Sequence, residues 1–162
     1  MEEAKFISSN EFRIELIQAV FAKNAGFRFI AKGFSMFPFI QDNDIITLSP
    51  LRHSSLGLGK VVACVCPTHK KLLLHRIVAR KKSYYLIKGD NITKPDFLID
   101  KRHILGCVTL IKRNNKTILL GLGPERVFIA FLSKIGVLSL LHSLSQLIPY
   151  SLRRFIKCRF LS

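Results

Sequence analysis

Three short stretches of the sequence contain the residue types of a nucleophilic active site. Ser35 lies in G-F-S-M-F-P, and His75 lies forty residues further on in L-L-L-H-R-I-V. Two acids, Asp90 and Asp96, follow in K-G-D-N-I-T-K-P-D. A serine hydroxyl is a poor nucleophile until a neighbouring base takes its proton, and that base needs a third group to orient it. These stretches therefore predict a serine, a histidine and an acid that act together.

Each of these residues also has a purely structural interpretation. Ser35 could fill a turn between large apolar residues. Strand alternation places His75 on the same face as Leu73 and Ile77, and a histidine on an apolar face is more often a core residue than a base. The Gly-Asp-Asn sequence at Asp90 favours a turn by itself. We favour catalysis because the three stretches occur together.

The three stretches resemble the conserved boxes of the signal peptidase I family, which shares its fold with the self-cleaving SOS repressors. The similarity includes G-F-S-M-F-P followed by Asp44-Ile45-Ile46, then Leu74-His75-Arg76-Ile77-Val78 and Lys88-Gly89-Asp90-Asn91. It covers residues 15 to 112. A histidine before Arg-Ile is the version seen in the endoplasmic-reticulum and archaeal branch, whereas most bacterial members have a lysine there.

The resemblance implies a serine endopeptidase that cleaves a signal or leader peptide without a cofactor. Ser35 would attack the carbonyl and its backbone N–H would bind the oxyanion, while His75 would accept and return the proton. Asp96 is the better match to the acid that orients His75, and Asp90 is the second choice, with a role in holding the loop. The family also implies an extended substrate against a strand edge. Candidates to line the cleft around the cut are Phe34, Met36 and Phe37.

The sequence departs from the family pattern in several places. Many signal peptidases have a second serine, as an oxyanion donor, where this chain has Gly33. The usual Gly-Asp pair after the serine box is Asn43-Asp44, and the later Gly-Asp-Ile-Val is Gly59-Lys60-Val61-Val62. These changes indicate a divergent member of the family.

The composition is both basic and apolar. The 162 residues include 26 Lys and Arg against 10 Asp and Glu, for a net charge of +16, and the mean hydropathy is +0.28. Such a charge attracts anionic lipid or nucleic acid. A second interpretation is therefore a catalytically inactive basic module that binds membrane or nucleic acid, although the peptidase interpretation expects no nucleic acid. A repressor is disfavoured because one predicted helix before Ser35 is too little for a helix-turn-helix module.

The four cysteines indicate reduced structural thiols rather than a disulfide framework. Cys64 and Cys66 lie in a predicted strand, and no second pair has the spacing of a zinc site. The other two are Cys107 and Cys158.

The local patterns predict a mainly β fold with coiled antiparallel strands, an N-terminal helix and a C-terminal helical extension. Residues 8–24 read as an amphipathic helix with a capping box at Ser8 and Glu11, an apolar face at Phe12, Leu16, Ala19 and Val20, and an end before Gly26. Short apolar runs predict strands at 27–31, 45–48, 60–66, 71–79, 84–87, 104–111 and 117–120. We expect a peptidase domain over 1–122, and the resemblance implies a partly barrel-like sheet.

The C-terminal extension, residues 123–162, is apolar and basic. Three alternatives stay open for 126–160: a helical pair packed on the β domain, an in-plane membrane anchor, or a full membrane span. Lys134 and Gly136 weaken the span. Because no export signal or N-terminal membrane anchor is recognised, we expect a peripheral membrane protein on the cytoplasmic side.

Overall fold

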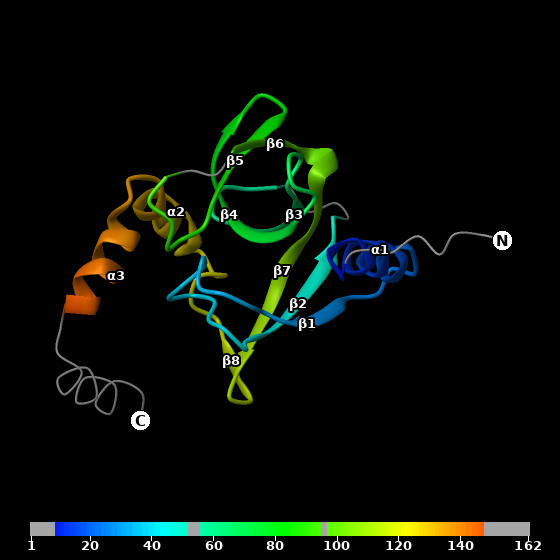
Figure 1. Ribbon diagram of the computed structural model, residues 1–162, viewed down its shortest axis with the longest axis horizontal. Helices are drawn as coiled ribbons and strands as arrows, with labels where there is room; N and C mark the ends of the chain where they lie inside the picture. Colours follow the sequence, from blue (N-terminus) through cyan, green and yellow to red (C-terminus); the bar gives the residue numbers. More distant parts are fainter. Residues whose placement is uncertain (1–8, 52–55, 95–96, 148–162) are drawn as a thin grey trace.

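The computed structural model describes residues 9–51, 56–94 and 97–147. Most of them belong to one antiparallel sheet of eight strands that curls without closing (Figure 1). The strand order is β1-β2-β7-β3-β4-β5-β6, with β8 paired to β7. The strands are β1 (Phe27–Ile30), β2 (Ile45–Pro50), β3 (Val61–Val65), β4 (Leu72–Lys81), β5 (Tyr84–Lys88), β6 (Phe97–Asp100), β7 (Ile104–Arg113) and β8 (Lys116–Ile118). A short 3₁₀ helix, Lys101–His103, connects β6 to β7.

Two apolar cores form because successive side chains of a strand point to opposite faces. On β3, Val61 joins a core with Met36 and Ile46, whereas Val62 joins a second core with Ile77. The first core fixes the segment that carries the predicted nucleophile, and the second packs on β4, the strand that carries the predicted base, and on β5.

The N-terminal helix α1, Ser9–Ala22, confirms the predicted helix in its main part. The predicted buried face is wrong, since Phe12 and Leu16 are exposed and Ile17 is the residue that is fully buried. Apolar residues are spread around this helix, so contacts with the sheet decide which of them is buried. The predicted cap at Ser8 lies outside the described residues.

The start of the C-terminal extension forms two helices, α2 (Arg126–Lys134) and α3 (Val137–Leu147). They separate at Gly136, whose φ of +81° suits a glycine. Ile129 and Ala130 are buried, and α2 packs against β4. Among the described residues, none of the helices has the length and apolar character needed to cross a bilayer. Figure 1 shows α2 and α3 on the opposite side of the sheet from α1.

The seven predicted strands are all present, with ends that shift by no more than two residues. The sequence prediction missed β6, which pairs with β5 from Tyr84↔Asp100 to Ile87↔Phe97. A four-residue strand has little periodicity of its own, so its partner strand provides the stabilisation that the local pattern does not show.

Candidate active site

The predicted nucleophile lies in a loop between β1 and β2 that is closed at its base. Ala31 N–H donates to the Asp44 carbonyl at 2.8 Å, and Asn43 N–H donates to the Ala31 carbonyl at 3.0 Å. The buried carboxylate of Asp44 accepts two hydrogen bonds from Arg113, both at 2.8 Å, and a third from Gln41 N–H. Asp44, which belongs to the first of the sequence boxes described above, therefore holds the ends of the serine loop together.

Ser35 lies on a turn, as the sequence predicted, and this turn is docked on the loop after β5. The Ser35 carbonyl accepts a hydrogen bond from Asn91 N–H at 2.8 Å, and the Phe34 carbonyl accepts one from Asn91 Nδ2 at 3.2 Å. Gly89 lets the two segments approach closely, since a Cβ there would lie 2.7 Å from the Ser35 carbonyl oxygen. The structure thus joins the first and third of the predicted stretches.

The second stretch lies on β4, where His75 is 3% exposed and faces Val62 of β3 in the register. Arg76, the next residue, is fully buried. Its guanidinium binds Asp90 through Nε–Oδ1 at 2.9 Å and Nη2–Oδ2 at 2.8 Å. Arg76 is therefore a buried cation that is paired with an acid.

The Arg76 side chain also contacts three further segments of the chain. Its Nη1 donates to the carbonyls of Gly59 at 2.7 Å and Gly121 at 2.9 Å, and the guanidinium carbon lies 5.2 Å from the centre of the Phe39 ring. Every polar group of a buried cation needs a partner, and these contacts supply them. The serine loop, the strand of His75 and the loop of Asp90 therefore meet around one side chain.

A cleft of about 200 Å³ opens beside Ser35. Its walls include Phe29–Gly33 of β1 and the following residues, Met36, and Leu72–Leu74 of β4. Asn10 and Arg13 of α1 complete it on another side. Leu74 directly precedes His75, so β4, the strand of the predicted base, lines the cleft together with Ser35, but His75 itself is not among the lining residues. Met36 lines this cleft, while Phe34 is 66% exposed.

The two predicted acids differ in what the structure shows. The Asp90 carboxylate is fully buried and accepts its hydrogen bonds from Arg76, which suits the role of holding the loop. Asp96 lies outside the described residues. The nearby Asp100 and Arg102 form a surface ion pair, with Nε–Oδ1 at 3.2 Å and an 85% exposed arginine.

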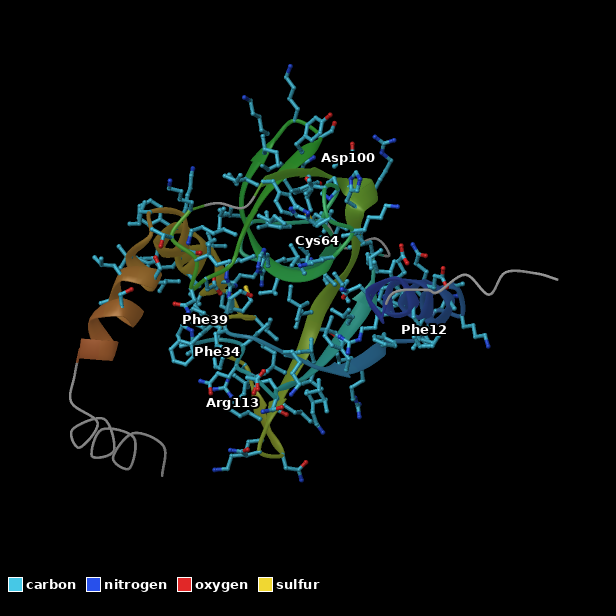
Figure 2. All side chains as sticks on the ribbon, viewed as in Figure 1. Phe12, Phe34, Phe39, Cys64, Asp100 and Arg113 are labelled. Atoms are coloured by element: carbon cyan, nitrogen blue, oxygen red, sulfur yellow. The ribbon has the colours of Figure 1, made fainter. Side chains whose placement is uncertain are left out.

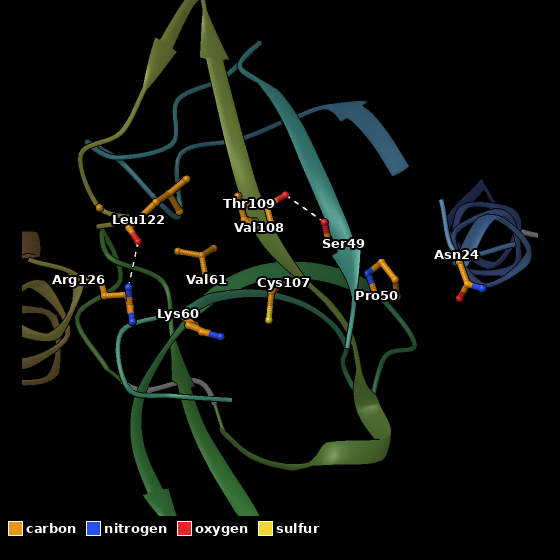
Figure 3. A pocket seen from close by; sticks show the side chains of 11 residues that line it. Asn24, Ser49, Pro50, Lys60, Val61, Cys107, Val108, Thr109, Leu122 and Arg126 are labelled. Carbon is orange, nitrogen blue, oxygen red and sulfur yellow. Dashed lines mark hydrogen bonds between the residues drawn. The ribbon is translucent and has the colours of Figure 1, made fainter. Parts of the chain in front are cut away.

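A second pocket, of about 520 Å³, contains none of the predicted catalytic residues (Figure 3). It is lined by parts of β2, β3 and β7 and by Arg126 of α2. Its hydroxyls, Ser49 and Thr109, are hydrogen-bonded to each other at 3.2 Å. Neither this pocket nor the cleft beside Ser35 has an imidazole among its described lining residues.

Sequence reasoning missed two residues of the site. Asn91 was treated only as part of a turn, and Lys88 was not singled out although it is fully buried, with Nζ 3.3 Å from the Gly89 carbonyl. A lysine is almost never fully buried unless it has partners. The only signal for both was their position in the K-G-D-N box.

Cys64, Cys66 and Cys107 are buried and reduced, as expected, whereas Cys158 lies outside the described residues. Within 9–51, 56–94 and 97–147, no group of three or more His, Cys, Asp or Glu side chains is arranged to hold a metal ion.

Comparison with protein-family models and with curated proteins gave no match to this chain. The resemblance to signal peptidases therefore depends on the short sequence boxes alone.

Proposed function

We propose that the protein is a serine endopeptidase that resembles signal peptidase I and cleaves a signal or leader peptide. The observation that carries this proposal is the hydrogen bond from Asn91 N–H to the Ser35 carbonyl, which docks the nucleophile turn on the K-G-D-N loop. Asp90 of that loop binds Arg76, the neighbour of His75. Three stretches that are far apart in the sequence are thereby packed together. We further propose that the eight-stranded antiparallel sheet has the fold shared by signal peptidases and SOS repressors.

In the proposed mechanism Ser35 Oγ attacks the carbonyl carbon of the scissile bond as His75 takes its proton. The Ser35 backbone N–H stabilises the oxyanion of the tetrahedral intermediate. Collapse of this tetrahedral intermediate breaks the C–N bond of the substrate, and His75 returns the proton to the leaving amine. Water then attacks the acyl-enzyme by the same route and regenerates Ser35. Asp96 is proposed to orient His75, and Asp90 to position the strand through Arg76.

The sheet offers two strand edges to an extended substrate. Among the described residues β1 pairs only with β2, and Leu72–Leu74 of β4 pair only with β3, since the pairing with β5 begins at Arg76. Both edges border the cleft beside Ser35. A peptide that adds as a strand here would find backbone donors and acceptors on either side and apolar side chains at the floor. This supports an extended, apolar leader as the substrate.

The test uses the purified full chain, a serine-directed acylating probe, and synthetic leader peptides that have small residues next to the bond to be cleaved. Ser35→Ala and His75→Ala should each lower labelling and cleavage by at least about 10³-fold, because each removes a member of one catalytic unit. Ser49→Ala, which removes a hydroxyl from the second pocket, should react as the wild type does. Wild-type activity in Ser35→Ala or His75→Ala would refute the mechanism. Absence of labelling, together with salt-sensitive binding to vesicles or DNA, would favour the non-enzymatic basic module.

A further inference from the structure

The helices α2 and α3 expose a continuous set of large apolar side chains. Six of them, between 46% and 64% exposed, are Val127, Phe128, Phe131, Ile135, Leu140 and Leu141. We call this set the α2–α3 face. A contiguous exposed apolar surface on a soluble domain usually marks an interaction site.

The helix α2 turns its more apolar side away from the sheet. Ile129 and Ala130 are buried on the side toward β4. Val127, Phe128 and Phe131 point away from that side and remain exposed. An amphipathic helix of a globular domain normally turns its apolar side toward the core. The exposed side of α2 therefore lacks an apolar partner among the described residues.

The charges around the face select an anionic partner. The only acid between 119 and 147 is Glu125, which accepts hydrogen bonds from Gly121 N–H at 2.7 Å and Gly123 N–H at 3.0 Å. No acid follows Glu125 in the sequence, whereas six Lys and Arg do, beginning with Arg126 and Lys134. Apolar side chains flanked only by cations are the composition of helices that lie in the surface of an anionic membrane.

The α2–α3 face is connected to the candidate active site. The turn between the two helices touches the K-G-D-N loop, since a Cβ at Gly136 would lie 3.8 Å from the Thr93 carbonyl oxygen. The same loop holds the serine turn, where Phe34 is 66% exposed. Figure 2 shows Phe34 on the side of the molecule that carries α2 and α3, and Phe12 on the opposite side.

We propose that the α2–α3 face docks in the plane of an anionic lipid bilayer and brings the serine turn to the membrane surface. The partner is lipid, because the face combines apolar bulk with an excess of positive charge. This proposal goes beyond the peptidase function and does not depend on the chemistry of Ser35.

Because the chain contains no tryptophan, the fluorescence of a single introduced tryptophan reports on its own site. Phe131→Trp and Phe12→Trp place one tryptophan at sites that are 56% and 58% exposed, on the α2–α3 face and on α1. With vesicles of phosphatidylcholine and phosphatidylglycerol, emission of the full-length Phe131→Trp variant should shift to the blue and be quenched by brominated acyl chains. Emission of Phe12→Trp should not change, nor should either variant respond to phosphatidylcholine alone. Equal responses of the two reporters, or none, would overturn the proposal.

Partition measurements give a second test. Phe128→Ser with Phe131→Ser should lower the partition coefficient for anionic vesicles by at least about tenfold, since two phenyl groups no longer enter the bilayer. Phe12→Ser should leave it unchanged, and Lys134→Gln should lower it about fivefold. Ser35→Ala should bind as the wild type does, so failure of the peptidase proposal would not affect this result. A concentration-dependent dimer without lipid, lost in the double variant, would assign the face to a second copy instead.

Discussion

The side chains of Arg76 and Asp90 form a two-pronged ion pair in which neither side chain is exposed to solvent. The pair connects β4, directly after His75, to the loop that docks the Ser35 turn. Carbonyls of Gly59 and Gly121 complete the coordination of the guanidinium. Burial of two charges is tolerated here because each has several charge-assisted hydrogen bonds.

We predict that breaking this buried pair will strongly destabilise the protein. Arg76→Met leaves the Asp90 carboxylate buried without its cation, which should cost about 3–5 kcal/mol in the free energy of unfolding. Urea unfolding of the full chain measures this. Arg76→Met combined with Asp90→Leu should recover much of the loss, because no uncompensated charge remains. Arg102→Met, which breaks the exposed pair with Asp100, is the matched control and should change little. Equal losses for the buried and exposed pairs would contradict this view.

A second prediction concerns the close approach at Gly89. A Cβ at this position would lie 2.7 Å from the Ser35 carbonyl oxygen, which belongs to the backbone and cannot rotate away. Gly89→Ala should therefore displace the serine turn and lower the acylation rate by about 10²-fold, as expected for a misplacement of about 1 Å. At Gly26 the nearest atom to an added Cβ is 3.3 Å away, so Gly26→Ala is the control and should keep its rate. A wild-type rate in Gly89→Ala would show that the docking does not position the nucleophile.

The parts of the fold that were predicted correctly are those with a local cause. The β-branched run of β3 and the turn residues around Ser35 act within a few residues, and the structure has a strand and a turn there. The buried side of α1 was not predicted correctly, because the sheet contacts that bury Ile17 and expose Phe12 are not encoded in the spacing of the helix.

In the candidate site, as in the fold, only the features that are local in the sequence could be predicted from it. The boxes at Ser35, His75 and Asp90 are visible in the sequence. The role of Arg76 is not, because its partners Gly59 and Gly121 come from segments 17 and 45 residues away. Only the folded sheet brings these carbonyls to one guanidinium.

The ion pair at the base of the serine loop leads to a third prediction. Asp44 is 1% exposed and accepts hydrogen bonds from Arg113 and Gln41, and Arg113 Nη2 also donates to the Phe39 carbonyl at 3.1 Å. Asp44→Ala should lower the free energy of unfolding by about 3 kcal/mol, since the hydrogen bonds to a buried carboxylate are lost. It should also make loop 31–44 sensitive to proteolysis under native conditions. Asp42→Ala, at an exposed pair with Lys32, should affect stability less. If loop 31–44 of the Asp44→Ala variant resisted proteolysis as well as the wild-type loop does, Asp44 would not be needed to hold the ends of this loop together.

The last prediction concerns pH and the loop that leads into α2. The backbone N–H of Glu125 itself, followed by that of Gly121, holds the pKa of the Glu125 carboxyl below its usual 4.5. A lowered pKa in the folded state means that the ionised carboxylate contributes to stability above the unfolded pKa. This contribution is lost as the pH falls through the folded value.

The stability difference between the wild type and Glu125→Gln should therefore be largest near neutral pH and should disappear once the pH drops well below 4.5. Urea unfolding of both proteins across this range measures it, and the uncharged glutamine serves as the control because it keeps an acceptor at the same place. Gly121 also accepts a hydrogen bond from Arg76, so loosening of this loop at acid pH should lower the acylation rate in parallel. A difference that grows toward acid pH would show that protonated Glu125, rather than the carboxylate, stabilises the loop.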